Sequence, residues 1–432
     1  MDGDERRVPE GRLARFARLA AVGARSSAGL LLSGSGNGAA EATAEALGTL
    51  RGLAAKVGQM ASYVDGIVPE QQRAAYEGAL ARLRAAAPKS SSAEIRALVE
   101  EELGAPIDRL FEAWDDDPIA SASIGQVHRA VVSGREVAVK VQHPGVARAI
   151  ESDLQNAGIL EHMAGAFGAR RFDSKGMLAV VRKRFREELD YGLEAERLRA
   201  FAKLHADFPL ARVPAVIEER SKKRVLTTEF VRGIDFEAAC ARDERARRAW
   251  AETLWRFVFR SNLVGGMFNA DPHPGNYIFD PDVLGGVTFL DFGCVQPIAT
   301  AERTHARAMH RSAMTRDQAT FRTAARALIG TRPGRMEDLM FDYVRFTFRP
   351  LFESPFHMTR EFAAQCVEGF KEMATGARKL KDEEITPVSP DLFFINRLQF
   401  GFYSVLARLD VRVDFAAVEK TFLDEPLADL ST

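Results

Sequence analysis

The stretch FNADPHPGNYIF, residues 268–279, places an aspartate, a histidine and an asparagine in one short run that prolines interrupt. A second stretch, FLDFG, follows at residues 289–293. Three interpretations of the first stretch are open: the ligand set of a metal hydrolase, an ordinary polar loop, or the catalytic loop of a phosphoryl-transfer enzyme. The residues before and after it separate these interpretations.

The spacing of the polar residues favours phosphoryl transfer. In the catalytic loop of kinases, HRDxxxxN, the aspartate precedes the asparagine by five positions, and Asp271 precedes Asn276 by the same interval. Asp291 heads the DFG that follows. Asn276 and Asp291 are then predicted ligands of Mg²⁺, which prefers hard oxygen atoms. Asp271 is predicted to act as the base, or as the group that orients the nucleophile.

A metal hydrolase built on Asp271 and His273 would need further histidines nearby. The next ones, His305 and His310, lie beyond the DFG in a predicted helix. We therefore expect His273, between two prolines, to be a structural residue that stiffens the loop.

The segment ASASIGQV, residues 120–127, is compared with the nucleotide-binding loop GxGxxGxV of kinases. Two alanines stand where the first two glycines would be, and small residues there allow backbone N–H groups to approach phosphate oxygens. Alanine lacks the positive-φ freedom of glycine, so the segment alone is a weak signal. The expected nucleotide contacts are Ala120, Ala122, Ser123, Gly125 and Val127.

The strand VAVK ends at Lys140, the type of lysine that contacts the α- and β-phosphates in kinases. In the long helix expected over 175–208, Asp190 and Glu194 are like charges four residues apart, which costs a few tenths of a kcal/mol unless a cation lies nearby. Lys140 is the natural cation, and Glu194 is its predicted partner. The alternative is a half-buried strand that ends in a surface lysine.

The segment VLTTEFVRG, residues 225–233, is an apolar strand that runs into a polar connector. At the corresponding place a kinase joins its two lobes. The backbone from Glu229 to Val231 is predicted to hydrogen-bond the edge of an adenine, and Thr228 to border the pocket.

The order of the predicted elements indicates an α+β fold. Helix formers dominate the first quarter, with helices expected over 70–86 and over 92–103. A hairpin around the SGR turn follows, then the long helix, a second strand pair around ERSKKR, and a mostly helical remainder. The predicted domains are a helical extension (1–105), an N-lobe (106–231) and a C-lobe (232–432).

Bulk properties exclude several classes of protein. Lys and Arg number 59 against 60 Asp and Glu, a formal charge of -1, so nothing attracts the whole chain to nucleic acid. Three scattered cysteines without a CxxC pair indicate a reducing compartment. The first residues, MDGDERRVPE, do not resemble a signal peptide, and no apolar run reaches the ~18 residues of a spanning helix. We expect a cytoplasmic protein without a transmembrane segment.

Attachment to a membrane surface is left open by a basic, amphipathic stretch over 11–33. Arg12, Arg15 and Arg18 step along one face of the helix predicted there. A solvated helix that packs its apolar side on the protein explains the same pattern.

Together these motifs resemble one known family, the atypical kinases of the UbiB group, also called the AarF or ADCK group. The resemblance covers the chain from about residue 8 to the C-terminal helices. The motifs that carry it are KVGQ (56–59), the alanine-rich loop, VAVK, ELD (188–190), ADPHPGN and DFG.

The resemblance implies a two-lobed, protein kinase-like fold with an N-terminal helical extension that carries the KxGQ motif over the active site. Lys56 and Gln59 would point inward, and Lys56 would meet Glu188 of the ExD motif, which also contains Asp190. The alternative is that the stripe of Lys56, Gln59 and Tyr63 on one helix face is a solvent face. The inward placement is favoured because it gives Glu188, which stands among other acids, a buried partner.

The resemblance also implies ATP and Mg²⁺ as cofactors, and a role in the metabolism of ubiquinone or another isoprenoid lipid. Implied partners are a lipid or quinone precursor, a membrane surface and a complex with biosynthetic enzymes. Members look like ATPases or small-molecule kinases, and the missing APE after the DFG argues against a protein kinase. The alternative is a nucleotide-gated scaffold that binds lipid or protein with little turnover.

Overall fold

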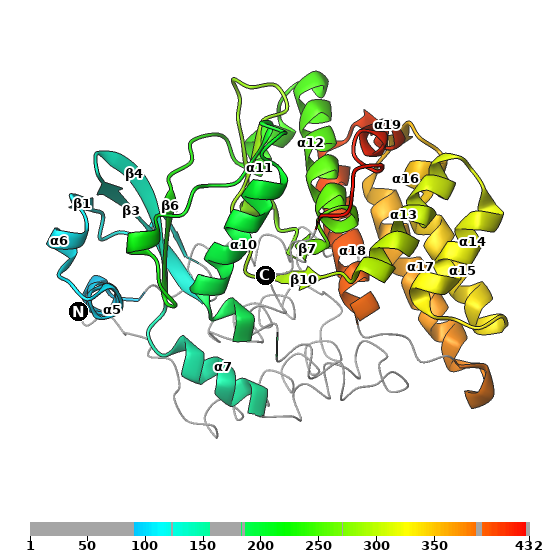
Figure 1. Ribbon diagram of the computed structural model, residues 1–432, viewed down its shortest axis with the longest axis horizontal. Coiled ribbons are helices and arrows are strands. Elements are labelled where there is room, and N and C mark those ends of the chain that lie inside the picture. The colour runs from blue at the N-terminus through cyan, green and yellow to red at the C-terminus, as the bar shows by residue number, and fades with distance from the viewer. Residues whose placement is uncertain are drawn as a thin grey trace, which may run out of the picture. The chain divides into compact units, whose positions relative to one another are not determined.

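The computed structural model describes residues 90–121, 124–155, 183, 186–269, 271–385 and 391–428 (Figure 1). The described chain divides into two compact units. The first comprises 90–155, 183–193 and 216–230, apart from the gaps, and the second comprises 194–215 and 231–428. Lys56, Gln59 and the helix predicted over 70–86 lie outside the described residues.

The first unit contains an antiparallel sheet in the order β1-β3-β4-β6, with β2 paired to β3. Its centre is the hairpin predicted from the SGR turn. Ser133 and Gly134 both have positive φ, 51° and 69°, which suits the twist of a two-residue hairpin turn. The strands are β1 (Ala113–Trp114), β2 (Ala120–Ser121), β3 (Gly125–Val132), β4 (Arg135–Gln142) and β6 (Val225–Glu229).

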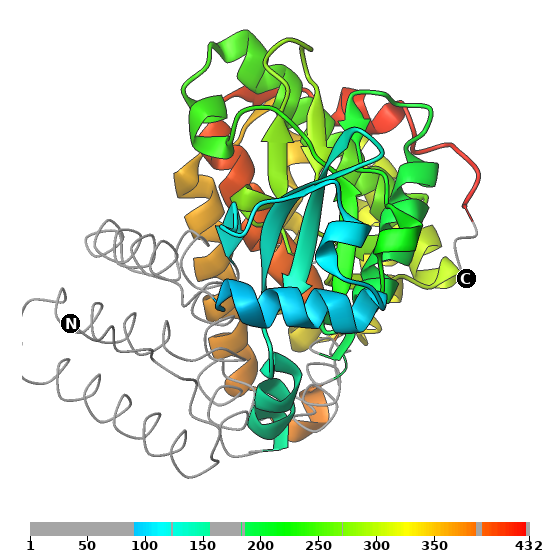
Figure 2. The ribbon, with the colours of Figure 1, turned by 90° about the vertical axis from the view of Figure 1, so that its left-hand side faces the viewer.

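Helix α5 (Ser92–Leu103) confirms the helix predicted over 92–103 and lies across this sheet (Figure 2). A capping box between Ser91 and Glu94 begins it, and Gly104 ends it with φ 79°. Although the predicted domain boundary at residue 105 lies after α5, the helix shares one core with the sheet. This core includes Ile95, Leu98, Val99, Val137, Val139, Val141 and Val225.

The single long helix predicted over 175–208 is wrong within the described residues. Backbone helix at 186–188 gives way to a turn at Leu189, and α10 (Tyr191–Leu204) begins anew. The Asp190 carboxylate accepts hydrogen bonds from the N–H groups of Gly192 (3.1 Å) and Leu193 (3.3 Å). Asp190 therefore caps a helix N-terminus, and it does not share a helix face with Glu194.

The second strand pair, predicted around ERSKKR, is reduced to one isolated bridge between Val216 and Thr228. A 3₁₀ turn, η2 (Glu218–Arg220), begins the connection at the predicted ERSKKR turn. The remaining helices of the first unit are α6 (Ile107–Leu110) and α7 (Val146–Gln155).

Helix α12 (Glu244–Leu263) is the centre of the second unit. Its aromatic side chains pack on both neighbouring layers: Phe257 stacks on Phe289 with ring centroids 3.5 Å apart, and Trp255 lies 4.0 Å from Phe415. Three short sheet segments surround α12. They are β5 (Ala211–Arg212), β8 (Tyr277–Phe279) and β9 (Val287–Phe289) in one sheet, β7 (Met267–Asn269) with β10 (Val295–Pro297), and β11 (Phe356–His357) with β12 (Arg412–Val413).

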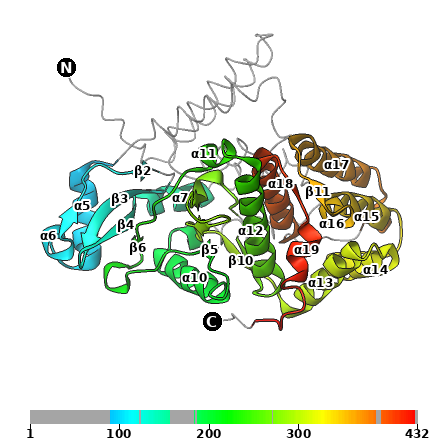
Figure 3. The same cartoon turned by 90° about the horizontal axis from the view of Figure 1, so that it is seen from above.

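The rest of the second unit is helical, as predicted. Helix α17 packs against both α15 and α18, as Figure 3 shows. The helices and 3₁₀ turns are α11 (Phe236–Cys240), η3 (Pro274–Asn276), α13 (Thr300–Met314), α14 (Gln318–Ile329), α15 (Arg335–Thr347), α16 (Arg349–Phe352), α17 (Arg360–Arg378), η4 (Asp382–Glu384), α18 (Asp391–Leu409) and α19 (Phe415–Lys420).

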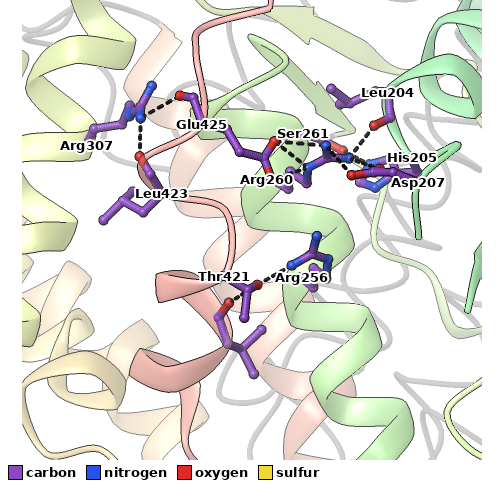
Figure 4. A network of polar contacts seen from close by, with 11 residues as sticks. Leu204, His205, Asp207, Arg256, Arg260, Ser261, Arg307, Thr421, Leu423 and Glu425 are labelled. Atoms are coloured by element: carbon purple, nitrogen blue, oxygen red, sulfur yellow. Dashed lines mark hydrogen bonds and ion pairs between the residues drawn. The ribbon is translucent and has the colours of Figure 1, made fainter.

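The segment 421–428, here called the C-terminal strap, is tied to the second unit by arginines (Figure 4). Arg260 of α12 is almost fully buried. It donates to the Leu204 carbonyl at the end of α10 and pairs with Asp207 (3.0 Å) and with Glu425 of the strap (2.8 Å). One guanidinium therefore joins α10, α12 and the strap.

Candidate active site

In the first unit, the sheet brings the predicted nucleotide loop and the predicted phosphate-binding lysine together. Ala120 and Val127 are cross-strand partners in the β2–β3 pair, and Val127 is in turn the partner of Lys140 in β4. The half-buried Lys140 has its amine 5.1 Å from the centre of the Tyr191 ring. Ala122 and Ser123, at the tip of the loop, lie outside the described residues.

Gly125 stands where the chain has no room for a side chain. A Cβ placed on it would lie 2.5 Å from the Val141 carbonyl oxygen and 2.6 Å from the Tyr191 hydroxyl. Real Cβ contacts of this length essentially never occur. Gly125 is therefore required by packing between β3, β4 and the start of α10, a requirement that the loop pattern alone does not indicate.

The predicted adenine-binding connector begins at the end of β6. Glu229, an exposed residue, is the cross-strand partner of Val137, and the Phe230 N–H donates to the Glu136 carbonyl (3.2 Å). The first unit ends at Phe230, and Val231 belongs to the second. Contacts of an adenine with Glu229 and Val231 stay a prediction.

The acidic residues around the start of α10 have different surroundings. Glu188 is buried in the first unit, and Glu194 is buried in the second. The predicted pair of Lys140 with Glu194 joins residues of different units and stays a prediction. The pairing of Glu188 with Lys56 lies outside the described residues.

In the second unit, one side chain links the two predicted catalytic segments. Asn269, the last residue of β7, accepts a hydrogen bond from the Asp271 N–H (3.2 Å) with its oxygen. With its nitrogen it donates to the Asp291 carbonyl (2.8 Å). Asp271 and Asp291 are thus brought together through the backbone of each. Sequence reasoning missed Asn269, although it stands two positions before Asp271.

Asn276 completes the cluster. Its side-chain amide nitrogen donates to the backbone carbonyl of Asp271 (3.0 Å). Its backbone carbonyl accepts from the N–H of Leu290 (3.0 Å), the residue before Asp291. Antiparallel pairing of β8 with β9 holds the two segments at this spacing. The spacing predicted from the sequence therefore corresponds to one hydrogen-bonded cluster, which contains Asp271, Asn276 and Asp291.

The donor atoms of this cluster suit Mg²⁺. The amide nitrogen of Asn276 is engaged by a carbonyl, which orients the amide oxygen as the atom that can face a cation. The Asp291 carboxylate accepts from the Gly293 N–H (2.9 Å), a contact that orients it. Within the described ranges, no three His, Cys, Asp or Glu side chains group closely enough to hold a metal. Mg²⁺ bound by one carboxylate, one amide and nucleotide phosphates needs no such group.

The proline-flanked histidine has a structural role. His273 is the N-cap of η3, and its Nδ1 accepts from the Gly275 N–H (2.9 Å). Helix α18 approaches the neighbouring Pro272 so closely that a Cβ on Gly401 would lie 2.6 Å from the proline Cγ. The glycine at 401 therefore permits α18 to pack against the predicted catalytic loop, a role the sequence alone did not reveal.

The chain after the DFG is short, as predicted from the missing APE. Residues Val295–Pro297 form β10, which pairs with β7, and α13 begins at Thr300. Arg197 of α10 donates to the carbonyls of Gly293 (2.8 Å) and Val295 (3.3 Å) in this segment. Sequence reasoning missed Arg197, which stands one helical turn beyond Glu194.

The sequence pattern described as "ABC1 atypical kinase-like domain" matches residues 82–325, more than half of the chain. The chain belongs to this family. The resemblance to the UbiB group is thereby confirmed. Because the family is kinase-like, membership implies the use of ATP.

Individual members of the ABC1 family are similar to this chain over part of their own length. "Atypical kinase COQ8B, mitochondrial" from Rattus norvegicus is 34% identical over 322 residues, 70% of this chain and 60% of the relative. "Atypical kinase coq-8, mitochondrial" from Caenorhabditis elegans is 34% identical over 249 residues, 56% of this chain and 32% of the relative. The chain thus spans about a third to three fifths of the length of these relatives.

The solved structure of Rv3197 with erythromycin, from Mycobacterium tuberculosis, superposes with a TM-score of 0.59 at 26% identity. The match covers 86% of this chain and 91% of that one. The mixed α+β, kinase-like fold is thereby confirmed, and the KxGQ extension stays a prediction. None of the helices in the described ranges is long and apolar enough to cross a membrane.

Proposed function

We propose that this ABC1-family protein is an ATP- and Mg²⁺-dependent phosphoryl-transfer enzyme, an atypical kinase or ATPase. One observation carries the proposal: Asp271, Asn276 and Asp291 belong to one hydrogen-bonded cluster, at the sequence spacing of a kinase catalytic loop and DFG. Phosphoryl transfer needs little covalent chemistry from the protein, so that positioning and charge stabilisation supply most of the catalysis.

Each residue of the cluster receives a role that its contacts permit. Asn276 and Asp291 would hold Mg²⁺, which neutralises charge on the transferred phosphoryl group when bound. Asp271, nearly fully buried, would accept a proton from the nucleophile or orient it. Lys140 would contact the α- and β-phosphates and be oriented by Glu194.

The nucleotide would lie against Ala120, Ala122, Ser123, Gly125 and Val127, with its adenine at the backbone of Glu229 and Val231. The sheet supports this assignment because it places Val127 directly beside Lys140. Lys56 and Gln59 of the KxGQ motif, with Glu188 and Asp190 of the ExD motif, would cover the site. For Asp190 the structure adds a second role, as the cap of α10.

The biological role that we propose is support of ubiquinone or other isoprenoid-lipid metabolism. It rests on family analogy with relatives such as COQ8B and coq-8. A quinone precursor, a membrane surface and the enzymes of such a pathway are the partners that follow from it. A cytoplasmic location stays a prediction, because the relatives named here are mitochondrial.

The decisive experiment is Mg²⁺-dependent ADP release by the purified protein and by Asp291→Asn. We expect Asp291→Asn to lower turnover at least about 100-fold, because the metal contributes several kcal/mol to charge stabilisation. Asp282→Asn, an equal charge change at an exposed position of the β8–β9 turn, is the control and should retain turnover. Equal turnover and equal nucleotide affinity in wild type and Asp291→Asn would remove the metal role.

A second candidate is a nucleotide-gated scaffold that binds ATP and then organises lipids or enzymes. The alanines at the nucleotide loop favour it, because they depart from the glycines of turnover-competent kinases. Single-turnover phosphate release separates the two functions: a scaffold binds ATP without releasing phosphate at a useful rate.

A protein kinase is disfavoured by the start of α13 at Thr300, and an unchanged phosphoproteome with Asp271→Ala would end that interpretation.

A further inference from the structure

The backbone of the DFG segment is held by a side chain from α10. The Arg197 guanidinium donates through Nη1 to the carbonyls of Gly293 (2.8 Å) and Phe292 (3.4 Å) and through Nη2 to that of Val295 (3.3 Å). A guanidinium presents several N–H groups in a rigid planar fork, so one arginine can serve three carbonyls. Lysine, with one flexible ammonium, reproduces this geometry only in part.

A second side chain holds the same segment one residue earlier. Asn269 donates to the Asp291 carbonyl and accepts from the Asp271 N–H. The carbonyls of Asp291, Phe292, Gly293 and Val295 therefore all accept hydrogen bonds from the side chains of Asn269 and Arg197. The conformation of the predicted metal-binding segment is specified by side-chain contacts to its backbone.

The helix that carries Arg197 is itself anchored. Phe201, one turn further along α10, packs on Phe292 (centroids 4.6 Å apart) and on Phe257 of α12 (5.6 Å). At the end of α10, Arg260 donates to the Leu204 carbonyl and pairs with Glu425 of the C-terminal strap (Figure 4). The helix that carries Arg197 is therefore held in place by packing against Phe292 and α12 and by the hydrogen bond from Arg260.

We propose that Arg197 and Asn269 are positioning residues that hold Asp291 in the one placement in which it meets magnesium-bound nucleotide. This inference rests on the proposed function. In many kinases the activation loop is ordered by phosphorylation. Here α13 begins at Thr300, soon after the DFG, and contacts from α10 and β7 order the segment in place of such a loop.

The test compares Arg197→Met, which keeps the apolar stem and removes the donors, with Arg197→Lys. Lys203→Met, an equal charge change at an exposed position of α10, is the matched control. We expect Arg197→Met to weaken the apparent Mg²⁺ affinity and to lower kcat by roughly 10- to 100-fold, as for partners that orient metal ligands. ATP affinity in EDTA should be unchanged, Arg197→Lys should restore part of the loss, and Lys203→Met should match wild type.

Hydrogen exchange supplies a readout that does not depend on turnover. Amides of residues 289–297 should exchange faster in Arg197→Met than in wild type, while those of α12 keep their rates. Asn269→Ser should accelerate exchange of the Asp271 amide and shift the Mg²⁺ dependence in the same direction. If Arg197→Met does not fold, Asn269→Ser carries the test.

The outcomes separate the inference from the function beneath it. Wild-type Mg²⁺ dependence and wild-type exchange over 289–297 in both variants would overturn the positioning role while turnover remains. Faster exchange without any change in the Mg²⁺ dependence of turnover would also overturn it, because the contacts would then be structural only. A wild-type protein without Mg²⁺-dependent turnover would remove the proposed function, and with it the role assigned to Arg197.

Discussion

Gly125→Ala tests whether the glycine of the nucleotide-loop pattern is required by packing within the first unit. The new Cβ would lie 2.5 Å from the Val141 carbonyl oxygen and 2.6 Å from the Tyr191 hydroxyl. Val141 is a fully buried residue of β4, and Tyr191 is fully buried at the start of α10. Neither neighbour can move away cheaply, so β3 must shift relative to both.

The size of the effect follows from two opposing contributions. Overpacking a well-packed core costs about 1–3 kcal/mol. Replacing a strand glycine by alanine returns roughly 0.5–1 kcal/mol, because the unfolded chain loses conformational freedom. Because both new contacts are shorter than 3.0 Å, the upper part of the overpacking range applies, and we expect Gly125→Ala to lower the free energy of unfolding by about 1–2 kcal/mol.

A double-mutant cycle with Tyr191→Phe tests the cause. Removing the hydroxyl relieves one of the two close contacts. The cost of Gly125→Ala should therefore be roughly 0.5–1 kcal/mol smaller in the Tyr191→Phe background than in wild type. This difference lies in the usual range of coupling energies between residues in contact. Gly134→Ala is the control. At Gly134 a Cβ meets nothing within 4 Å, but φ is +69°, so its cost of about 1–2 kcal/mol comes from the backbone and should not depend on Tyr191.

The assay is urea unfolding followed by circular dichroism, combined with hydrogen exchange of β3 and β4 to localise the effect. A cost below about 0.5 kcal/mol for Gly125→Ala would refute the packing argument. So would an equal cost in the presence and absence of the Tyr191 hydroxyl. Packing would then not require a glycine at position 125.

Two further predictions concern the second unit. Burial, with the nearby charges of Arg260 and Arg256, lowers the pKa of His205 from 6.5 to about 3. The unfolded chain therefore binds a proton at a higher pH than the folded protein does. The free energy of unfolding, which has its full value above pH 6.5, falls as the pH drops toward 3. Between pH 6.5 and 4.5 the wild type should lose up to about 2.7 kcal/mol of its free energy of unfolding through His205, and His205→Phe should remove this loss. Urea unfolding at several pH values measures it, and an equal pH dependence in wild type and His205→Phe would contradict the prediction. Arg260→Met breaks the buried ion pair and should lower the free energy of unfolding by about 3–5 kcal/mol. A double-mutant cycle with Glu425→Gln should give a coupling energy of at least roughly 0.5 kcal/mol. Additive effects of the two substitutions would show that this pair does not hold the C-terminal strap.

The contacts of His205 suit a neutral ring. Ser261 donates its hydroxyl proton to the Phe257 carbonyl (2.7 Å), so the Nε2 of His205 must donate to the Ser261 oxygen (2.9 Å). A single proton on Nε2 satisfies this geometry, and the ring stacks on Phe257 (4.4 Å) as a neutral aromatic group. Protonation would place a charge beside two arginines in a buried site.

Features that depend on neighbours in the sequence could be predicted from it. The helix at α5 follows from Ser91, Glu94 and Gly104, because capping contacts span only a few residues. The β3–β4 hairpin follows from the Ser133–Gly134 turn for the same reason. The break at Asp190 was missed because strong helix formers surround it, and the side-chain cap that starts α10 prevailed over their propensity.

For the candidate site, the sequence by itself determined which chemistry is proposed, because the identities and spacing of Asp271, Asn276 and Asp291 are properties of two short stretches. Only the tertiary structure decided how these stretches are held. Asn269 bridges the two aspartate segments, Arg197 reaches the DFG carbonyls from α10, and Gly401 admits α18 beside Pro272. Such contacts join residues distant along the chain, and no local pattern encodes them, since they arise only when packed elements bring a donor or a vacant Cβ position to a particular backbone atom.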